Sequence, residues 1–96
     1  MFIVGTSVRY HRNPDVVVRE EPGDLWLFFD PDTNQKRFSN AVGACVWELC
    51  DGTRDLGQIV DGICAAFDGA SPDEARADVR ALLQGMEADH FIVRAD

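Results

Sequence analysis

The sequence predicts an α+β domain in which a three-stranded antiparallel sheet is followed by three helices. Hydrophobic residues show strand-like patterns from Val16 to Ser39 and recur with a period of about 3.6 after Asn40. Strand signals and helix signals therefore occupy separate parts of the chain, which is typical of α+β proteins. The length of 96 residues allows one hydrophobic core and leaves little room for a deep catalytic cleft.

The three strands are expected to be short and joined by short links. Residues 16–20 are rich in β-branched side chains, and Pro22-Gly23 supplies a turn. The apolar run at 25–29 is too short for a helix and makes a second strand. A polar loop at 30–34 then leads to a third strand at 36–39, which completes a meander.

The first two helices are expected on either side of Gly52. Residues 40–51 carry one apolar stripe, and glycine is the residue type that most often ends a helix. Asp55, with Gln58 three residues later, resembles a capping box. The second helix therefore begins at Asp55 and ends before Gly69.

The third helix has the strongest start signal of the three. Ser71 is a suitable N-cap, Pro72 suits the first helical position, and Glu74 completes a capping box. This helix is expected to reach about Asp89. The apolar residues that follow, 90–93, are expected to form an extended tail.

The beginning of the chain has no clear hydrophobic period. Residues 1–13 are expected to be an N-terminal arm that lies along the domain or is partly mobile, and the domain itself is expected at 14–96. The apolar start at 2–4 is too short for a signal peptide or a membrane span. We therefore expect a cytoplasmic protein with no membrane partner.

The charge opposes a role in nucleic-acid binding. The formal net charge is −8, whereas binding to phosphates depends on Lys and Arg. A winged-helix DNA-binding regulator would need a basic recognition helix, but the second helix at 55–67 contains neither Lys nor Arg. The DNA-binding alternative is therefore disfavoured.

The cysteines and histidines do not form a recognisable metal or catalytic motif. Cys45 and Cys50 are five residues apart on a helix and point in different directions, unlike the close pairs of zinc sites. Together with Cys64 they are interpreted as buried apolar side chains, and a redox or metal role is the alternative. His11 and His90 are expected at the surface. No enzymatic activity and no cofactor are predicted.

The loop after the second strand resembles the opening of a calcium-binding loop. Asp30, Asp32 and Asn34 match the spacing D-x-D-x-N. Gln35 stands where the loop needs glycine, however, and Ala41 stands where the bidentate glutamate should be. The segment is interpreted as a polar hairpin loop.

The surface offers two other candidate features. The third strand lies at an edge of the predicted meander, where its unpaired main-chain groups could bind an extended peptide. The alternative interpretation is that Lys36 and Arg37 on this edge only oppose aggregation. The second feature is on the third helix, where Arg76, Arg80 and Leu83 lie beside the core stripe. The alternative interpretation is that the two arginines belong to a solvated face with no binding role. The predicted core stripe comprises Ala75, Val79, Leu82 and Met86.

Three segments in this order resemble one known family. They are the hairpin sequence L-W-L-F-F-D-P that leads into Ser39-Asn40, W-E-L-C-D-G-T-R-D-L-x-x-I-V at 47–60, and D-V-R-A-L-L-x-x-M at 78–86. Over about residues 14–93 the chain resembles PqqD and its relatives, the peptide-binding domains also called RiPP recognition elements. The resemblance implies a winged helix-turn-helix-like fold.

The resemblance also implies a function and a site. In this family the leader segment of a ribosomally synthesised precursor peptide adds as a strand to the third strand, in the groove beside the third helix. The peptide-binding residues implied here are Gln35, Lys36, Arg37, Phe38, Ser39, Arg76, Val79, Arg80 and Leu83. Arg76 and Arg80 are expected to select acidic leader residues, with Val79, Leu83 and Phe38 as an apolar floor.

The expected partner besides the precursor peptide is a modifying enzyme. A radical S-adenosylmethionine (SAM) enzyme is favoured, and a protease, as in lasso-peptide maturation, is the alternative. The chain would act as a non-catalytic chaperone that presents the leader. The open sheet edge also allows a homodimer.

Overall fold

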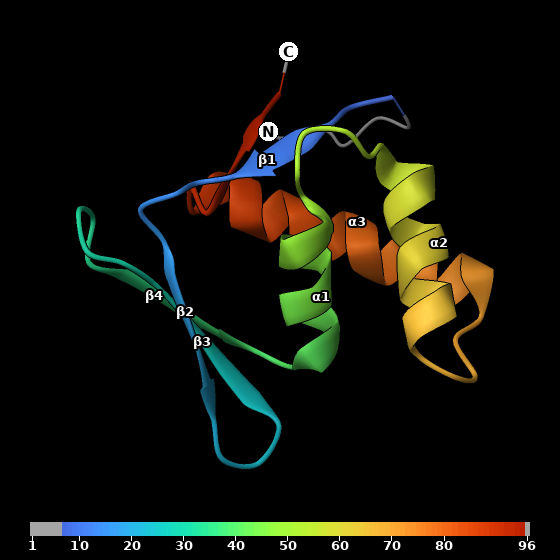
Figure 1. Ribbon diagram of the computed structural model, residues 1–96, viewed down its shortest axis with the longest axis horizontal. Coiled ribbons are helices and arrows are strands. Elements are labelled where there is room, and N and C mark those ends of the chain that lie inside the picture. The colour runs from blue at the N-terminus through green and yellow to red at the C-terminus, as the bar shows by residue number, and fades with distance from the viewer. Residues whose placement is uncertain (1–6, 96) are drawn as a thin grey trace.

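The computed structural model describes residues 7–95 and confirms the predicted α+β class (Figure 1). An antiparallel sheet of order β2-β3-β4 comprises β2 (Val17–Glu21), β3 (Leu25–Asp30) and β4 (Gln35–Ser39). Three helices follow, namely α1 (Ala41–Leu49), α2 (Leu56–Ala66) and α3 (Pro72–Ala88). A separate two-stranded ribbon joins β1 (Tyr10–Arg12) to β5 (Ile92–Arg94).

The central strand β3 has apolar side chains on both faces of the sheet. Phe28 points inward and is fully buried, with its ring stacked on Phe91 and edge-on to Trp47 at centroid distances of 6.2 and 5.8 Å. Its neighbours Leu27 and Phe29 point to the other face, because successive residues of a strand alternate. The inner face thus packs on the core, and the outer face is partly apolar and faces solvent.

The first two helices begin and end close to where the sequence predicts. Asn40 caps α1 by accepting a hydrogen bond from the backbone N–H of its first turn at 3.0 Å. The capping box between Asp55 and Gln58 is formed in both directions at the start of α2. Gly52 adopts a φ of +87° in the linker between these helices, a conformation that favours glycine.

The predicted capping box at the start of α3 is wrong. Ser71 occupies the N-cap position, but its side chain makes no capping hydrogen bond, so Glu74 has no box to complete. Pro72 lies in the first turn, where its missing N–H has no intrahelical acceptor in any case. Asp73 and Glu74 in the first turn instead stabilise the positive end of the helix dipole.

The core draws on both ends of the chain as well as on the sheet and the helices. Its fully buried apolar residues are Tyr10, Phe28, Val46, Cys50, Leu56, Ile59, Val79, Leu83, Met86, Phe91 and Ile92. Residues 10–12 of the expected arm therefore lie along the domain, and the expected extended tail forms β5. The part of the arm at 1–6 falls outside the described residues.

A hydrogen-bonded triad centred on the buried Glu87 attaches the β1–β5 ribbon to α3. The carboxylate of Glu87 accepts a hydrogen bond from the Tyr10 hydroxyl at 3.0 Å and another from Nε of Arg94 at 2.7 Å. Glu87 is only 8% exposed, and a buried carboxylate is stable only when its oxygens are paired. Burial, together with the hydrogen bond to Glu87, raises the pKa of Tyr10 to about 12.

We expect Tyr10→Phe to lower the free energy of unfolding by about 1–2 kcal/mol, because it removes one hydrogen bond and leaves Glu87 paired with Arg94. The pKa of Tyr10 rises from 10.0 to about 12 on folding, so the stability that its proton contributes is full below pH 10 and is lost as the pH rises to about 12. Urea unfolding across this interval should show a smaller loss of stability in Tyr10→Phe than in the wild type. Equal losses would contradict the role of the triad.

Candidate functional site

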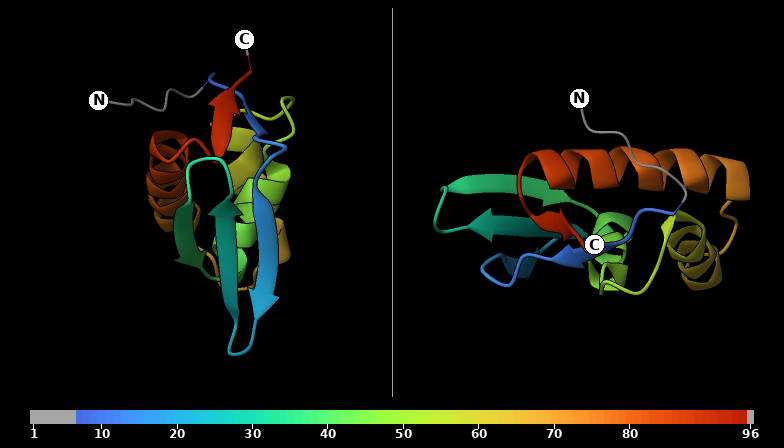
Figure 2. Two further views of the ribbon diagram at one scale, coloured as in Figure 1. Left: turned by 90° about the vertical axis from the view of Figure 1, so that its left-hand side faces the viewer. Right: turned by 90° about the horizontal axis from the view of Figure 1, so that it is seen from above.

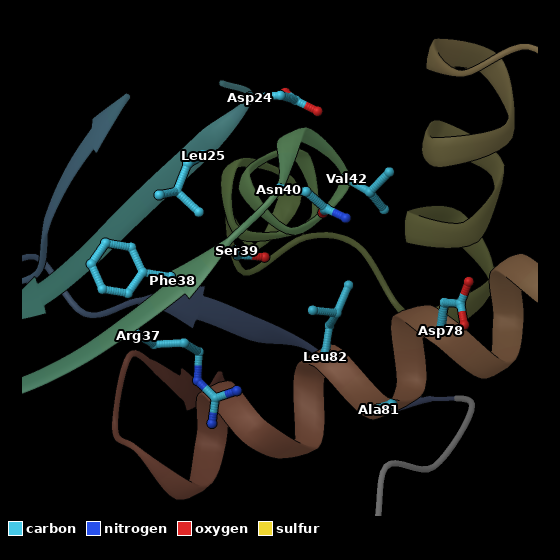
Figure 3. Close-up of a pocket in the computed structure, with 10 residues that line it drawn as sticks. All are labelled: Asp24, Leu25, Arg37, Phe38, Ser39, Asn40, Val42, Asp78, Ala81 and Leu82. Atoms are coloured by element: carbon cyan, nitrogen blue, oxygen red, sulfur yellow. The ribbon is translucent and has the colours of Figure 1, made fainter. Parts of the chain in front are cut away.

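An open groove of about 750 Å³ lies where β4 diverges from α3 (Figure 3). It is lined by Asp24, Leu25, Arg37, Phe38, Ser39, Asn40, Val42, Asp78, Ala81 and Leu82, and is called the β4–α3 groove below. Its walls are mixed, with apolar side chains in the centre and carboxylates at the margin (Figure 3). A groove with these dimensions accepts an extended segment better than it encloses a small molecule.

The strand beside the groove has an open edge. Among the strands of the described residues, β4 pairs only with β3, so alternate main-chain N–H and C=O groups of Gln35–Ser39 point away from the sheet. In Figure 2 the left view shows β4 between β3 and α3, with this edge turned toward the helix. Unpaired edge groups beside a groove are the arrangement that strand addition requires.

One end of the groove is closed by Arg37. Its Nε donates to a carboxylate oxygen of Asp89 at 2.7 Å, and its Nη2 lies 2.6 Å from the same oxygen. Gln35 donates to the other oxygen of Asp89 at 3.1 Å. The guanidinium lies on Gly85, where an added Cβ would be 3.1 Å from Nη2. These contacts tie β4 to the C-terminal end of α3.

The remaining residues of β4 point in alternating directions. Phe38 is 59% exposed, the largest exposed fraction among the large apolar side chains of the described residues. Lys36 lies on the outer face, with its ammonium nitrogen 5.6 Å from the ring centroid of Phe29. Ser39 packs against the start of α1, where a Cβ at Gly43 would overlap its hydroxyl group. The main chain of β4 is therefore fixed while its edge stays open.

The two adjacent leucines of α3 have the opposite roles to those that the sequence analysis assigned. Leu83 is fully buried, whereas Leu82 is only partly buried and lines the β4–α3 groove. Val79 is also fully buried and has no surface to offer a ligand. The hydrophobic period locates the apolar stripe, but residues 100° apart at its margins are distinguished only by the packing of the helix.

The two arginines of α3 lie outside the groove. Relative to the buried Val79, Asp78 and Leu82 lie on one flank of the helix, and Arg76 and Arg80 lie on the other, as the helical repeat requires. Arg80 follows the flank that carries Glu87, and its Nε is buried without a hydrogen-bond acceptor among the described residues. The structure therefore brings Arg37, Phe38 and Ser39 together with Leu82, but not with these arginines.

Several residues of the groove are not predicted from the sequence. Val42 and Leu82 were assigned to apolar stripes, and Asp24 and Asp78 had no partner in sequence that marked them. Leu25 was expected only as part of a strand, but it is 39% exposed beside Phe38. No local signal identifies these residues, because the groove joins α3 to segments that are far from it in the sequence.

One cysteine lies in the core and the other two pack against it. Cys50 is fully buried, its thiol donates to the carbonyl of Val46 at 3.2 Å, and burial raises its pKa to about 12. Burial also raises the pKa of Cys45, and Cys64 is a free, partly buried thiol. Within residues 7–95, no cluster of three or more His, Cys, Asp or Glu side chains has the geometry of a metal site.

The polar loop after β3 forms a turn at 31–34. Asp30 is 3% exposed, and its carboxylate accepts a hydrogen bond from the backbone N–H of Asp32 at 2.9 Å. Asn34 adopts a φ of +61° just before β4. His11 and His90 are both exposed. In the part of the chain that the structure describes, no helix is long and apolar enough to cross a membrane.

Comparison with known proteins identifies the family. The family described as "Coenzyme PQQ synthesis protein D (PqqD)" matches residues 26–92, which is more than half of the chain. The chain belongs to the PqqD family. The matched segment runs from β3 into β5 and contains β4, α3 and most of the β4–α3 groove. The resemblance stated for the sequence motifs is thereby confirmed.

Two solved structures share the fold. TbiB1 in complex with the TbiA(beta) leader peptide is 22% identical, with a TM-score of 0.68 over 85% of this chain and 93% of that chain. Lasso peptide synthetase B1 complexed with the leader peptide is 10% identical, with a TM-score of 0.69 over 88% of this chain and 98% of that chain. No curated protein matches the sequence. At these identities the likeness establishes the architecture.

Two neighbouring substitutions test the assignment of α3. We expect Leu83→Ala to lower the free energy of unfolding by about 2–5 kcal/mol, because it leaves a cavity in the core. Leu82→Ala should cost less than about 1.5 kcal/mol, because Leu82 already contacts solvent in the groove. Chemical denaturation of both variants measures the difference. A larger loss for Leu82→Ala would show that the helix is rotated from the arrangement described.

Proposed function

We propose that this PqqD-family domain is a non-catalytic chaperone that binds the leader segment of a ribosomally synthesised precursor peptide by adding it as a strand to β4. The open edge of Gln35–Ser39 beside the β4–α3 groove is the observation that carries the proposal. In strand addition, main-chain hydrogen bonds supply much of the affinity and side-chain pockets supply specificity. The two solved structures described above each contain a leader peptide, which supports the same mode here.

The proposed contact residues differ in role. The main chain of Gln35–Ser39 pairs with the peptide, and Leu82 supplies apolar contact on the groove side. Phe38 and Lys36 lie beside the peptide residues that point to the outer face of the sheet. Of the residues that the family resemblance implied, Val79 and Leu83 support the groove from beneath. Arg76 and Arg80 are left outside the proposed contact set.

The charge of the second sheet edge favours β4 as the peptide site. The other edge strand, β2, carries Arg19, Glu20 and Glu21, with Arg19 and Glu21 paired at 2.8 Å. Charged side chains on an edge strand oppose further pairing, and β2 carries three of them, whereas β4 carries Lys36 and Arg37, of which Arg37 is held by Asp89. A homodimer through a sheet edge stays a prediction.

The second proposed partner is the enzyme that modifies the bound peptide. We propose a radical SAM enzyme, with the chain acting in the cytoplasm, where its three cysteines remain free thiols. A leader-binding partner of a protease is the second candidate, supported by the likeness to lasso peptide synthetase B1. The genes beside this one distinguish the two candidates. A short precursor reading frame is expected there together with a gene for either a radical SAM enzyme or a protease.

The structure offers little support for a DNA-binding function. The helix α2, which would be the recognition helix of a winged helix-turn-helix, has the sequence LGQIVDGICAA and contains no Lys or Arg. The net charge of −8 repels phosphate in addition. Binding of the precursor remains the function that accounts for both the open edge and the groove.

Two proline variants of β4 test strand addition. Adjacent residues of an edge strand direct their N–H groups to opposite sides, so either Lys36→Pro or Arg37→Pro removes a donor from the free edge without breaking the pairing with β3. The variant that keeps the circular dichroism spectrum and melting temperature of the fold should bind the leader of the neighbouring precursor about tenfold more weakly, or worse.

Lys36→Ala and Arg37→Ala are the matched controls, because they remove the same side chains and keep the main-chain donors. Isothermal titration calorimetry with the synthetic leader measures all four variants. Full affinity in the folded proline variant would refute strand addition at β4. Chemical-shift changes on leader binding should map to 35–39 and to the groove side of α3.

A further inference from the structure

The β4–α3 groove carries an excess of negative charge. Asp24 and Asp78 line it and are exposed, and neither forms an ion pair with a Lys or Arg side chain of the described residues. The one basic residue of the lining, Arg37, is already paired with Asp89 at 2.6 Å. A ligand in the groove therefore meets two uncompensated carboxylates.

The centre of the groove is apolar. Leu82 projects into it between Arg37 and Asp78, and Val42 approaches from the start of α1 (Figure 3). Phe38 and Leu25 form the opposite margin, with 59% and 39% of their surface exposed. An occupant gains most by placing a bulky apolar side chain over Leu82, since this removes apolar surface of both partners from water.

We propose that the segment recognised by the groove is basic, with a bulky apolar side chain over Leu82 and a Lys or Arg side chain beside Asp78. This inference rests on the proposed function and names the class of peptide. It reverses the expectation of an acidic leader, because Arg76 and Arg80, on which that expectation rested, lie on the far flank of α3. An acidic side chain at the same place would face Asp78 in a chain whose net charge is −8.

The rise per residue of α3 and of an added strand determines how far apart the apolar and the basic residue lie in the peptide. Asp78 and Leu82 are four residues apart on α3, which corresponds to about 6 Å along the helix axis. Alternate residues of an added strand point to the same side and are about 6.6 Å apart. The apolar and the basic residue of the peptide are therefore expected at positions i and i+2. Their order depends on the direction in which the peptide runs.

A phage-displayed library of random twelve-residue peptides tests this inference without knowledge of the natural precursor. The library is selected on the full chain, on Asp78→Lys and on Asp61→Lys. Asp61 is an exposed residue in the middle of α2, outside the groove lining, and its replacement makes the same change in net charge. The wild type and Asp61→Lys should both enrich an apolar residue and a Lys or Arg two positions apart. Asp78→Lys should enrich Asp or Glu at the second position.

Synthetic copies of one selected peptide, with Lys or Glu at the second position, make the result quantitative. The wild type should prefer the Lys form by about tenfold, as is typical of a charge-assisted contact, and Asp78→Lys should reverse the order. Two outcomes would overturn this inference and leave the proposed function standing. In both, the selected peptides lose affinity for the folded proline variant of β4, but they show either no preference for a basic residue or the same preference on Asp78→Lys as on the wild type. Peptides that bind the folded proline variant of β4 at full strength would overturn the proposed function itself.

Discussion

The C-terminal end of α3 is fixed from two sides, and the shape of the molecule around the groove depends on this. On one flank Glu87 accepts hydrogen bonds from Tyr10 and Arg94 of the β1–β5 ribbon. Two residues later, Asp89 accepts hydrogen bonds from Gln35 and Arg37 of β4. The end of the helix is thus tied to both strand systems, whereas its earlier turns diverge from β4. The groove opens where these ties stop.

The two anchors use the same chemistry in different surroundings. Glu87 is nearly buried, so the loss of either partner would leave an under-satisfied carboxylate, and the triad holds the ribbon in one position. The carboxylate of Asp89 is somewhat more exposed than that of Glu87, at 17% against 10% of the side chain, while the two paired arginines are about equally exposed. The main effect of the pair of Arg37 and Asp89 is geometric, since it places a planar guanidinium over Gly85 and closes one end of the groove.

The groove is negatively charged because the basic side chains of the described residues are paired with other carboxylates or lie outside it. Arg94 and Arg37 are paired with carboxylates of α3, and Arg19 is paired with Glu21 on the other sheet edge. The arginines that remain on α3 lie on the flank away from β4. Asp24 and Asp78 are consequently left to set the local charge. The partly apolar outer face of the sheet ends at Lys36 and Phe38 of the edge strand β4. A strand added to β4 would extend this face.

The sequence by itself determined the class and order of the elements, since these depend on local signals. The change of hydrophobic period at Asn40 and the capping box at Asp55 each act over a few residues, and both appear in the structure. The first helix ends at Leu49, three residues before the predicted stop at Gly52, which lies in the linker. The family motifs are local in the same way, and the third strand, expected at 36–39, is found at Gln35–Ser39.

Only the tertiary structure decided which flank of α3 faces β4 and how the chain ends pair. Leu82 and Leu83 are equivalent in a hydrophobic pattern, and the rotation that buries Leu83 places it in the core cluster together with distant residues such as Tyr10 and Phe28. The β1–β5 pairing likewise joins residues at opposite ends of the chain, such as Tyr10 and Arg94. These long-range contacts exclude Arg76 and Arg80 from the groove and bring Asp78 into it, so the charge that a ligand meets is a property of the fold and not of any single motif.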